Sequence, residues 1–256
     1  CWRGCDKGRN CSNNVSYNNI LTSSGTNGFG IYLYVNNNYN NFYHNNITTL
    51  GYGGDAIVTY LTNTYNNFYY NNVTTFGSYG VGIYLYISAS SNNISYNNIT
   101  TLETYSNSVV LYSSNSNNVS NKNATTFNNN AYSIYLYDSN LNNISTNNIK
   151  TYGNLGIGVY VELSSNTNNI LNNIITTLGD SGRGIWIYSS TSNNASNNFI
   201  TTSGTSGHGI TVYSASLNSV SNNIIKILGD TGRGINLYIS GNSNNIFSND
   251  ITSSGA

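Results

Sequence analysis

The sequence has no proline and no methionine, and charged residues make up only 6% of its 256 residues, against about 25% in an ordinary soluble domain. Eight basic residues balance eight acidic ones. A nucleic-acid-binding domain needs a cluster of Lys and Arg that displaces counterions, and this balance offers none. No apolar run approaches the roughly 20 residues of a membrane-spanning helix. The composition therefore excludes a nucleic-acid partner and a membrane span.

A repeat of 25 to 27 residues runs through almost the whole chain. Each copy begins with Asn-Asn and an apolar residue, except that the copy at Asn218 has Ser in second place. The copies begin at Asn13, Asn40, Asn66, Asn92, Asn117, Asn142, Asn168, Asn193, Asn218 and Asn244.

Within each copy, apolar residues alternate with polar or aromatic ones at period two, which is typical of strands. A repeat this short cannot bury its apolar side alone, so stacked repeats must share one core. The sequence therefore predicts an all-β fold, a parallel β-helix (β-solenoid) of about ten 25–27-residue turns with no helical domain.

The composition divides the chain into a Cys-rich basic segment at residues 1–12 and a β-solenoid domain at residues 13–256. The first segment holds all three cysteines, Cys1, Cys5 and Cys11. An odd number of cysteines in a surface protein indicates interchain disulfides. A metal site lacks a local fourth ligand, and a lipid anchor at Cys1 is a further alternative. Because the chain begins with Cys1 and not Met, we expect a mature or trimmed product.

The elements Gly-Ile-Tyr-Leu-Tyr and Asn-Asn-Ile-Ser-x-Asn-Asn-Ile-Thr resemble the repeats of NosD-type, carbohydrate-binding/sugar-hydrolase (CASH-type) right-handed parallel β-helix proteins of archaeal cell surfaces. The resemblance covers roughly residues 13–256. The bias toward Asn and Tyr, the low charge and the N-terminal cysteines are also similar to the tubular sheath (hoop) proteins of chain-forming methanogens. This second resemblance implies an amyloid-like, cross-linked assembly.

The acidic residues form no pattern typical of catalysis. Glycoside hydrolysis uses paired carboxylates, whereas the acids here fall on different turns of the repeat. No motif for a metal, a nucleotide or a nucleophile is present. The sequence therefore predicts no catalytic residues, no metal, no cofactor and no enzymatic activity.

One pair of charges recurs in two similar segments. Asp180 and Arg183 lie in Leu-Gly-Asp-Ser-Gly-Arg-Gly-Ile, and Asp230 and Arg233 lie in Leu-Gly-Asp-Thr-Gly-Arg-Gly-Ile. Alignment of the repeats places Arg183, His208 and Arg233 in one column. This pattern fits a loop ion pair repeated in related turns, or a site for an anion or a sugar acid.

One column of the alignment is tyrosine in every turn except at Glu162. Its tyrosines are Tyr34, Tyr60, Tyr86, Tyr112, Tyr137, Tyr188, Tyr213 and Tyr238. Strand alternation places this column outside the core. Tyrosine is enriched at interfaces and offers a flat apolar ring, so the column predicts a lateral interface between subunits or a sugar-binding ladder. The alternative is that tyrosine only stabilises the strands.

The Asn-rich repeat also creates candidate N-glycosylation sites, including Asn46, Asn72, Asn98 and Asn123. Together these features predict an extracellular or cell-surface structural glycoprotein that self-assembles into a cross-β, amyloid-like sheath, filament or surface layer. Its expected partners are other copies of itself, through end-to-end and lateral contacts, and glycans or an underlying S-layer. The alternative is a carbohydrate-binding surface adhesin that uses the aromatic face.

Overall fold

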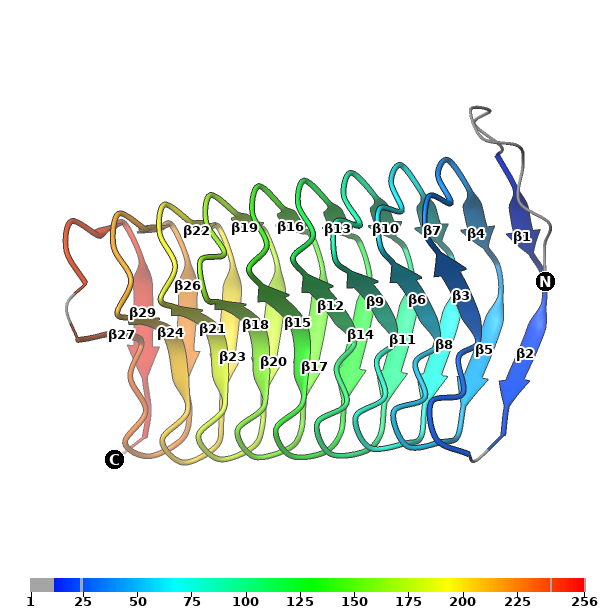
Figure 1. Cartoon of the computed structure of the whole chain (residues 1–256). Helices are drawn as coiled ribbons and strands as arrows, with labels where there is room; N and C mark the ends of the chain where they lie inside the picture. Colours follow the sequence, from blue (N-terminus) through cyan, green and yellow to red (C-terminus); the bar gives the residue numbers. More distant parts are fainter. Residues whose placement is uncertain (1–11, 24, 240, 256) are drawn as a thin grey trace.

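The computed structural model describes residues 12–23, 25–239 and 241–255. This part of the chain forms a right-handed parallel β-helix built from three sheets (Figure 1). Each turn contributes one short strand to each sheet, which we call sheets A, B and C.

Sheet A comprises β1 (Asn14–Ser16), β4 (Asn41–Tyr43), β7 (Asn67–Tyr69), β10 (Asn93–Ser95), β13 (Asn118–Ser120), β16 (Asn143–Ser145), β19 (Asn169–Leu171), β22 (Asn194–Ser196), β25 (Ser219–Ser221) and β28 (Asn245–Phe247). Sheet B comprises β2 (Asn19–Thr22), β5 (Asn46–Thr49), β8 (Asn72–Thr75), β11 (Asn98–Thr101), β14 (Asn123–Thr126), β17 (Asn148–Thr151), β20 (Ile174–Thr177), β23 (Phe199–Thr202), β26 (Ile224–Ile227) and β29 (Asp250–Ser253). Sheet C comprises β3 (Ile31–Tyr34), β6 (Ile57–Tyr60), β9 (Ile83–Tyr86), β12 (Val109–Tyr112), β15 (Tyr132–Tyr137), β18 (Ile157–Glu162), β21 (Arg183–Tyr188), β24 (His208–Tyr213) and β27 (Ile235–Tyr238).

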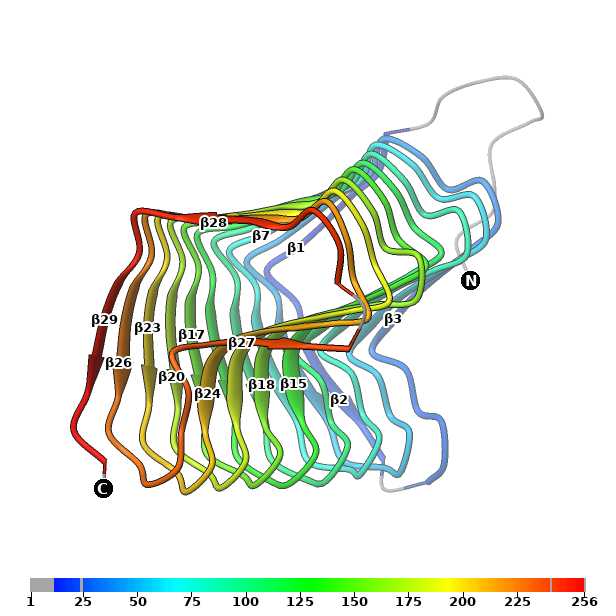
Figure 2. The ribbon, with the colours of Figure 1, turned by 90° about the vertical axis from the view of Figure 1, so that its left-hand side faces the viewer.

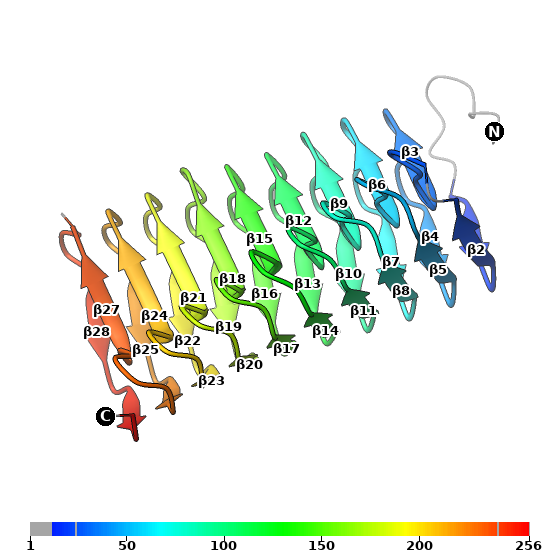
Figure 3. The same ribbon diagram turned by 90° about the horizontal axis from the view of Figure 1, so that it is seen from below.

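Every strand pairs in parallel with its counterparts one turn away, as the view from below shows (Figure 3). Ile83, for example, pairs with Ile57 on one side and Val109 on the other. The register therefore turns each column of the sequence repeat into a line of side chains along the helix axis. The predicted fold class is confirmed. The described residues form about nine full turns, one fewer than predicted, because sheet C has nine strands and sheets A and B have ten.

The core is the closed space between the inner faces of the three sheets. Phe68, Ile94, Ile99 and Leu136 are fully buried there. Each such side chain contributes about 1.5–3 kcal/mol to folding. The same columns supply apolar residues in turn after turn, so the core is continuous along the stack.

Two columns of buried asparagines run beside this apolar core. Within a column, the backbone N–H and the side-chain Nδ2 of one asparagine donate to Oδ1 of the asparagine one turn later. Asn66 N donates to Asn92 Oδ1 at 2.8 Å, and Asn71 Nδ2 donates to Asn97 Oδ1 at 3.0 Å. Such ladders satisfy polar groups that would otherwise be buried without partners. Two asparagine ladders therefore run along the stack beside the apolar core.

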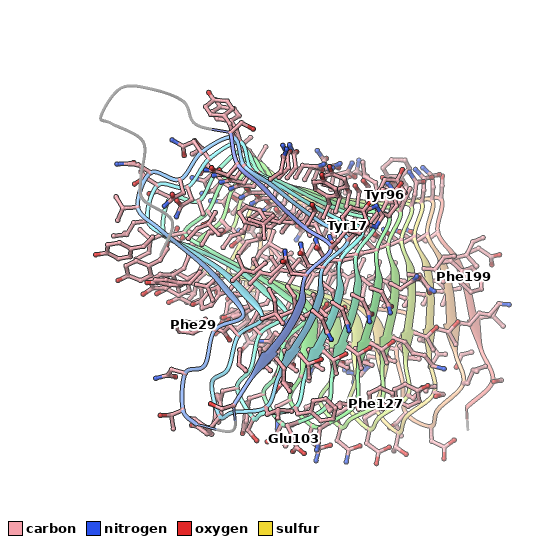
Figure 4. The ribbon with its side chains drawn as sticks, turned by 90° about the vertical axis from the view of Figure 1, so that its right-hand side faces the viewer. Tyr17, Phe29, Tyr96, Glu103, Phe127 and Phe199 are labelled. Carbon is pink, nitrogen blue, oxygen red and sulfur yellow. The ribbon has the colours of Figure 1, made fainter. Side chains whose placement is uncertain are left out.

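A left-handed corner joins sheets A and B in each turn, one residue before the ladder position. Positive φ occurs at Tyr17, His44, Tyr70 and Tyr96, and the asparagines that follow the last three are buried. The corner side chains point outward and stack, with ring centroids 5.0–5.3 Å apart from Tyr17 to Tyr96. Figure 4 shows Tyr17 and Tyr96 at this corner.

One position in the asparagine ladders holds a lysine. Lys122 replaces asparagine in the column of Asn97 and is buried, with Nζ 3.4 Å from Ser108 Oγ. The next inward residue of the strand is Ala124, where neighbouring turns have Ile99 and Ile149. Burial lowers the pKa of Lys122 to about 7. The turn that buries the Lys122 amine thus has a smaller core side chain, Ala124, than its two neighbours.

Candidate functional site

The tyrosines of the predicted ladder all lie in strands of sheet C, on its outer face. Figure 2 shows sheet C between sheet A and the loops that leave sheet B. Figure 4 shows Phe29 beside the start of sheet C and Phe199 on the outer face of sheet B, so the two residues belong to different faces. Three outward columns cross sheet C, and we name them after their first members: the Phe29, Tyr32 and Tyr34 columns.

The Tyr34 column contains the predicted tyrosines, and the structure stacks them. Ring centroids lie 5.7, 5.1, 5.0 and 4.6 Å apart in sequence from Tyr34 to Tyr137. A second run joins Tyr188, Tyr213 and Tyr238 at 5.0 and 5.2 Å. The register places Glu162 between the two runs. The structure thus brings the predicted ladder together in two blocks, separated by one carboxylate.

Glu162 is held by two tyrosines of the neighbouring Tyr32 column. The Tyr135 hydroxyl donates a hydrogen bond to Glu162 Oε2, and the Tyr160 hydroxyl is also hydrogen-bonded to Glu162. Burial, together with Glu162, raises the pKa of both tyrosines well above the usual value. Both hydroxyls therefore stay protonated at neutral pH, and Glu162 acts as the acceptor.

The aromatic packing around Tyr160 ties this carboxylate to the next turn. Tyr160 stacks on Tyr135 at 5.2 Å and on Trp186 at 4.7 Å. Tyr132 meets Tyr160 edge-on, with ring centroids 5.2 Å apart. The Arg183 guanidinium lies over the Trp186 ring, 4.3 Å from its centroid, a favourable cation–π arrangement.

Arg183 is only weakly partnered in the described part of the chain. Its Nη1 donates to Ser181 O at 3.5 Å, the limit of a hydrogen bond. Its Nε and the indole Nε1 of Trp186 are buried without an acceptor among the described residues. Burial lowers the pKa of Arg183 from its ordinary value, yet arginine remains charged in proteins. Among the described residues, Arg183 therefore has no acidic side chain as an ion-pair partner.

The Phe29 column extends this basic character along sheet C. Arg183 pairs in register with His208, and Arg233 N donates to His208 Nδ1 at 3.2 Å. Burial lowers the pKa of His208, and the two arginines lower it further. His208 is therefore neutral at pH 7, and the positive charge of the column comes from the arginines.

Three of the four residues predicted as loop ion pairs, Asp180, Arg183 and Arg233, have hydrogen-bond or cation–π partners. Asp180 Oδ1 accepts a hydrogen bond from Thr205 N at 2.8 Å. No ion pair joins Asp180 to Arg183, both of which the structure describes, and Arg183 lies against Trp186 instead. Arg233 Nη1 donates to Asn236 Oδ1 at 3.3 Å.

The candidate N-glycosylation sites lie on another face. Asn46, Asn72, Asn98 and Asn123 are exposed on the outer face of sheet B. Their side chains bond one another along the stack, as from Asn72 Nδ2 to Asn46 Oδ1 at 3.1 Å. Their glycosylation stays a prediction. The predicted cross-linking residues Cys1, Cys5 and Cys11 lie outside the described residues.

Within residues 12–23, 25–239 and 241–255, no three His, Cys, Asp or Glu side chains are grouped to hold a metal ion. The same part of the chain has no helix that is long and apolar enough to cross a membrane.

Sequence reasoning did not select the group formed by Tyr132, Tyr135, Tyr160, Glu162 and Trp186. The signal was present, because Glu162 is the one residue that breaks the tyrosine column. Treating the acids as scattered over the chain hid this substitution. The contacts with Tyr135 and Tyr160 depend on side-chain directions that the repeat pattern does not specify.

Comparison with known proteins places the fold among right-handed parallel β-helix proteins. Neither a protein-family model nor a curated protein matches the sequence. The periplasmic alginate epimerase AlgG is similar in structure, with a TM-score of 0.54 and 12% identity over 91% of this chain and 77% of that one. DFA-IIIase from Arthrobacter chlorophenolicus A6, solved in complex with DFA-III, has a TM-score of 0.53 and 12% identity over 86% of this chain. The chain spans 63% of the length of that enzyme. At this identity the likeness shows the fold alone.

These comparisons correct one prediction. The sequence analysis concluded that the chain is not an enzyme, but both of these similar structures are enzymes. The conclusion rested on the absence of paired acids along the sequence. That criterion did not consider single charged side chains such as Glu162, which accepts from Tyr135, and Arg183, which lies over Trp186.

Proposed function

We propose that this protein binds polysaccharide along the outer face of sheet C, as a β-helix that acts on saccharides outside the cytoplasm. The observation that carries the proposal is the stacked Tyr34 column, whose rings repeat every 4.6–5.7 Å from Tyr34 to Tyr137. Tyr34 and Tyr238 remain exposed at the two ends of the column. Flat aromatic rings with a polar edge suit a ligand that has apolar faces and hydroxyl groups.

The similar structures support this proposal by their chemistry. One is named for its action on alginate and the other was solved with a saccharide, DFA-III. AlgG is described as periplasmic, which agrees with a location outside the cytoplasm. Charged residues are few in this stack, and Glu162 and Arg183 are two of them on this face that can orient a ligand.

The test is binding of a panel of soluble polysaccharides, including alginate, measured by isothermal titration calorimetry. We expect Tyr112→Ala to weaken binding, because it opens the middle of the Tyr34 column. Tyr152→Ala is the matched control, since Tyr152 stacks on Phe127 at 4.8 Å in a loop away from the column. NMR spectra of each polysaccharide after incubation would report turnover. Equal binding by both variants, or none by the unmodified protein, would refute the proposal.

A second candidate function is self-assembly into a stacked sheath, filament or surface layer. The observation that favours it is the first described turn, where a hollow of about 820 Å³ opens onto core residues such as Val15, Ile20 and Leu33. A strand edge without a partner can pair with another chain. The asparagine ladders would continue in register across such a contact. An underlying S-layer and disulfides through Cys1, Cys5 and Cys11 belong to this candidate.

Self-assembly is tested by electron microscopy of the native material with and without reductant. Ordered filaments or sheets with a repeat of about 4.8 Å along the stack, loosened by reductant, would support it. Discrete particles that reductant does not change would refute it.

A further inference from the structure

Positive charge is rare on this molecule, and the outer faces of sheets B and C each carry two of the described basic side chains. The described residues include five Lys and Arg side chains. Lys122 is buried in the core, and Lys150 and Lys226 are exposed on sheet B. Arg183 and Arg233 lie in the Phe29 column of sheet C, with His208 between them.

Within residues 12–23, 25–239 and 241–255, no acidic side chain forms an ion pair with Arg183. Glu162 accepts hydrogen bonds from the Tyr135 and Tyr160 hydroxyls, and Asp180 accepts one from the backbone N–H of Thr205. A partly buried charge without a counter-ion is costly, and each unsatisfied buried N–H adds a desolvation penalty. Arg183 Nε and Trp186 Nε1 are two such groups. The arrangement is therefore unfavourable in the isolated chain and would be relieved by an acceptor that carries negative charge.

The chemistry of Arg183 indicates which acceptor fits. A guanidinium presents several N–H donors in a planar fork that matches the oxygens of a carboxylate, and similar anions, in a bidentate pair. Trp186 holds the plane of this fork by stacking. The same aromatic column, through Tyr160, leads directly to Glu162.

Glu162 supplies the complementary contact. An ionised carboxylate has about four acceptor positions, of which Tyr135 and Tyr160 use two. The remaining positions suit a sugar hydroxyl and repel an anion. The two sides of the Tyr160–Trp186 stack are thus distinct: one side selects negative charge, and the other selects a hydroxyl donor.

We propose that Arg183, Trp186 and Glu162 form a subsite for an anionic sugar residue, with the anionic group on Arg183 and a ring hydroxyl on Glu162. This inference rests on the proposed function and narrows its ligand to an acidic polysaccharide. The anionic group is a carboxylate, as in a uronic acid, or a sulfate ester, and both offer the oxygens that Arg183 binds.

The experiment measures binding of three probes by isothermal titration calorimetry: polygalacturonate, dextran sulfate and neutral dextran. The subsite predicts that the unmodified protein binds a charged probe more tightly than dextran. Preference for polygalacturonate identifies a carboxylate, and preference for dextran sulfate identifies a sulfate ester. We expect Arg183→Gln to weaken binding of the preferred probe by about tenfold or more, as for loss of one partner of a charge-assisted pair.

The matched control is Lys226→Gln. Lys226 carries the same charge and also lies over an aromatic ring, 5.2 Å from the centroid of Phe199, but on sheet B. We expect this variant to bind like the unmodified protein. Trp186→Phe keeps the ring and removes the indole N–H, and it should weaken binding of the charged probe while circular dichroism shows an intact fold.

Two results would overturn the subsite while leaving the proposed function in place: equal affinity for dextran and the charged probes, or equal losses in Arg183→Gln and Lys226→Gln. The second result would show that binding follows net charge and not this site. Absence of binding to every polysaccharide would instead overturn the proposed function, and the subsite with it.

Discussion

The buried amine of Lys122 makes a quantitative prediction about stability against pH. Burial lowers its pKa from 10.5 to about 7, which corresponds to about 5 kcal/mol at about 1.4 kcal/mol per pKa unit. Below pH 7 both the folded and the unfolded chain carry the proton, so the folded state bears the full cost. Between pH 7 and 10.5 the unfolded chain binds more protons at this site, so the free energy of unfolding rises with pH. Above 10.5 the cost is gone.

We therefore expect the free energy of unfolding to increase by about 2 kcal/mol between pH 7 and pH 9 through Lys122 alone. Urea titrations followed by tryptophan fluorescence measure it at both pH values. Lys122→Met keeps an apolar side chain of similar length without the amine, and Lys122→Asn restores the ladder residue. Both variants should lose this rise. Tyrosines titrate in all of these proteins, so the difference between them isolates the lysine.

Lys150→Asn is the control, because Lys150 is exposed one turn further along sheet B. It should keep the pH dependence of the unmodified protein. If the unmodified protein and Lys122→Met change equally between pH 7 and pH 9, the amine is not buried in the neutral form, and the reasoning fails.

Three further predictions concern other buried polar groups. Burial raises the pKa of Asp55 from 3.8 to about 7, against the opposing hydrogen bond from Val81 N. The free energy of unfolding should therefore fall by up to about 4 kcal/mol as pH rises from about 4 to about 7. Asp55→Asn should remove this fall in urea titrations at pH 4 and pH 7. Asn142→Ala removes the Oδ1 that accepts a hydrogen bond from Asn117 N at 2.7 Å and should lower the free energy of unfolding by about 2–4 kcal/mol. The neighbouring Asn143→Ala, on the outer face, should lower it by less than about 1 kcal/mol. Equal losses of stability in the two variants would contradict the role of the ladder. Glu162→Gln should lower the free energy of unfolding by about 1–2 kcal/mol, because charge-assisted hydrogen bonds from tyrosine become neutral ones. The control Glu103→Gln, on an exposed loop (Figure 4), should change the unfolding midpoint little.

The repeat made the fold predictable from sequence to the level of individual columns. Apolar alternation at period two assigned the inner positions, and parallel register follows once turns of equal length stack. The inward-facing Ile83 column and the outward Tyr34 column both lie where the alignment places them. In the first four turns the corner between sheets A and B departs from local preference, because tyrosine or histidine adopts the positive φ and the asparagine that follows belongs to the ladder. Tertiary hydrogen bonding overrides local preference there.

The candidate site was only partly predictable. Alternation places the Tyr34 column outside, and alignment places Arg183 and His208 in one column. The link from Tyr135 and Tyr160 to Glu162 crosses between columns and between turns, and it depends on rotamers that a repeat pattern does not encode. The position of Arg183 on Trp186, and not beside Asp180, depends on the same choice of side-chain direction.

The most direct test of the central claim, that the outer face of sheet C binds saccharide, is a crystal structure of the protein with an oligogalacturonate. The account predicts sugar rings along the Tyr34 and Tyr32 columns, with a carboxylate on Arg183 and a hydroxyl on Glu162. Sugar bound on the outer face of sheet B, or only in the loops, would contradict it.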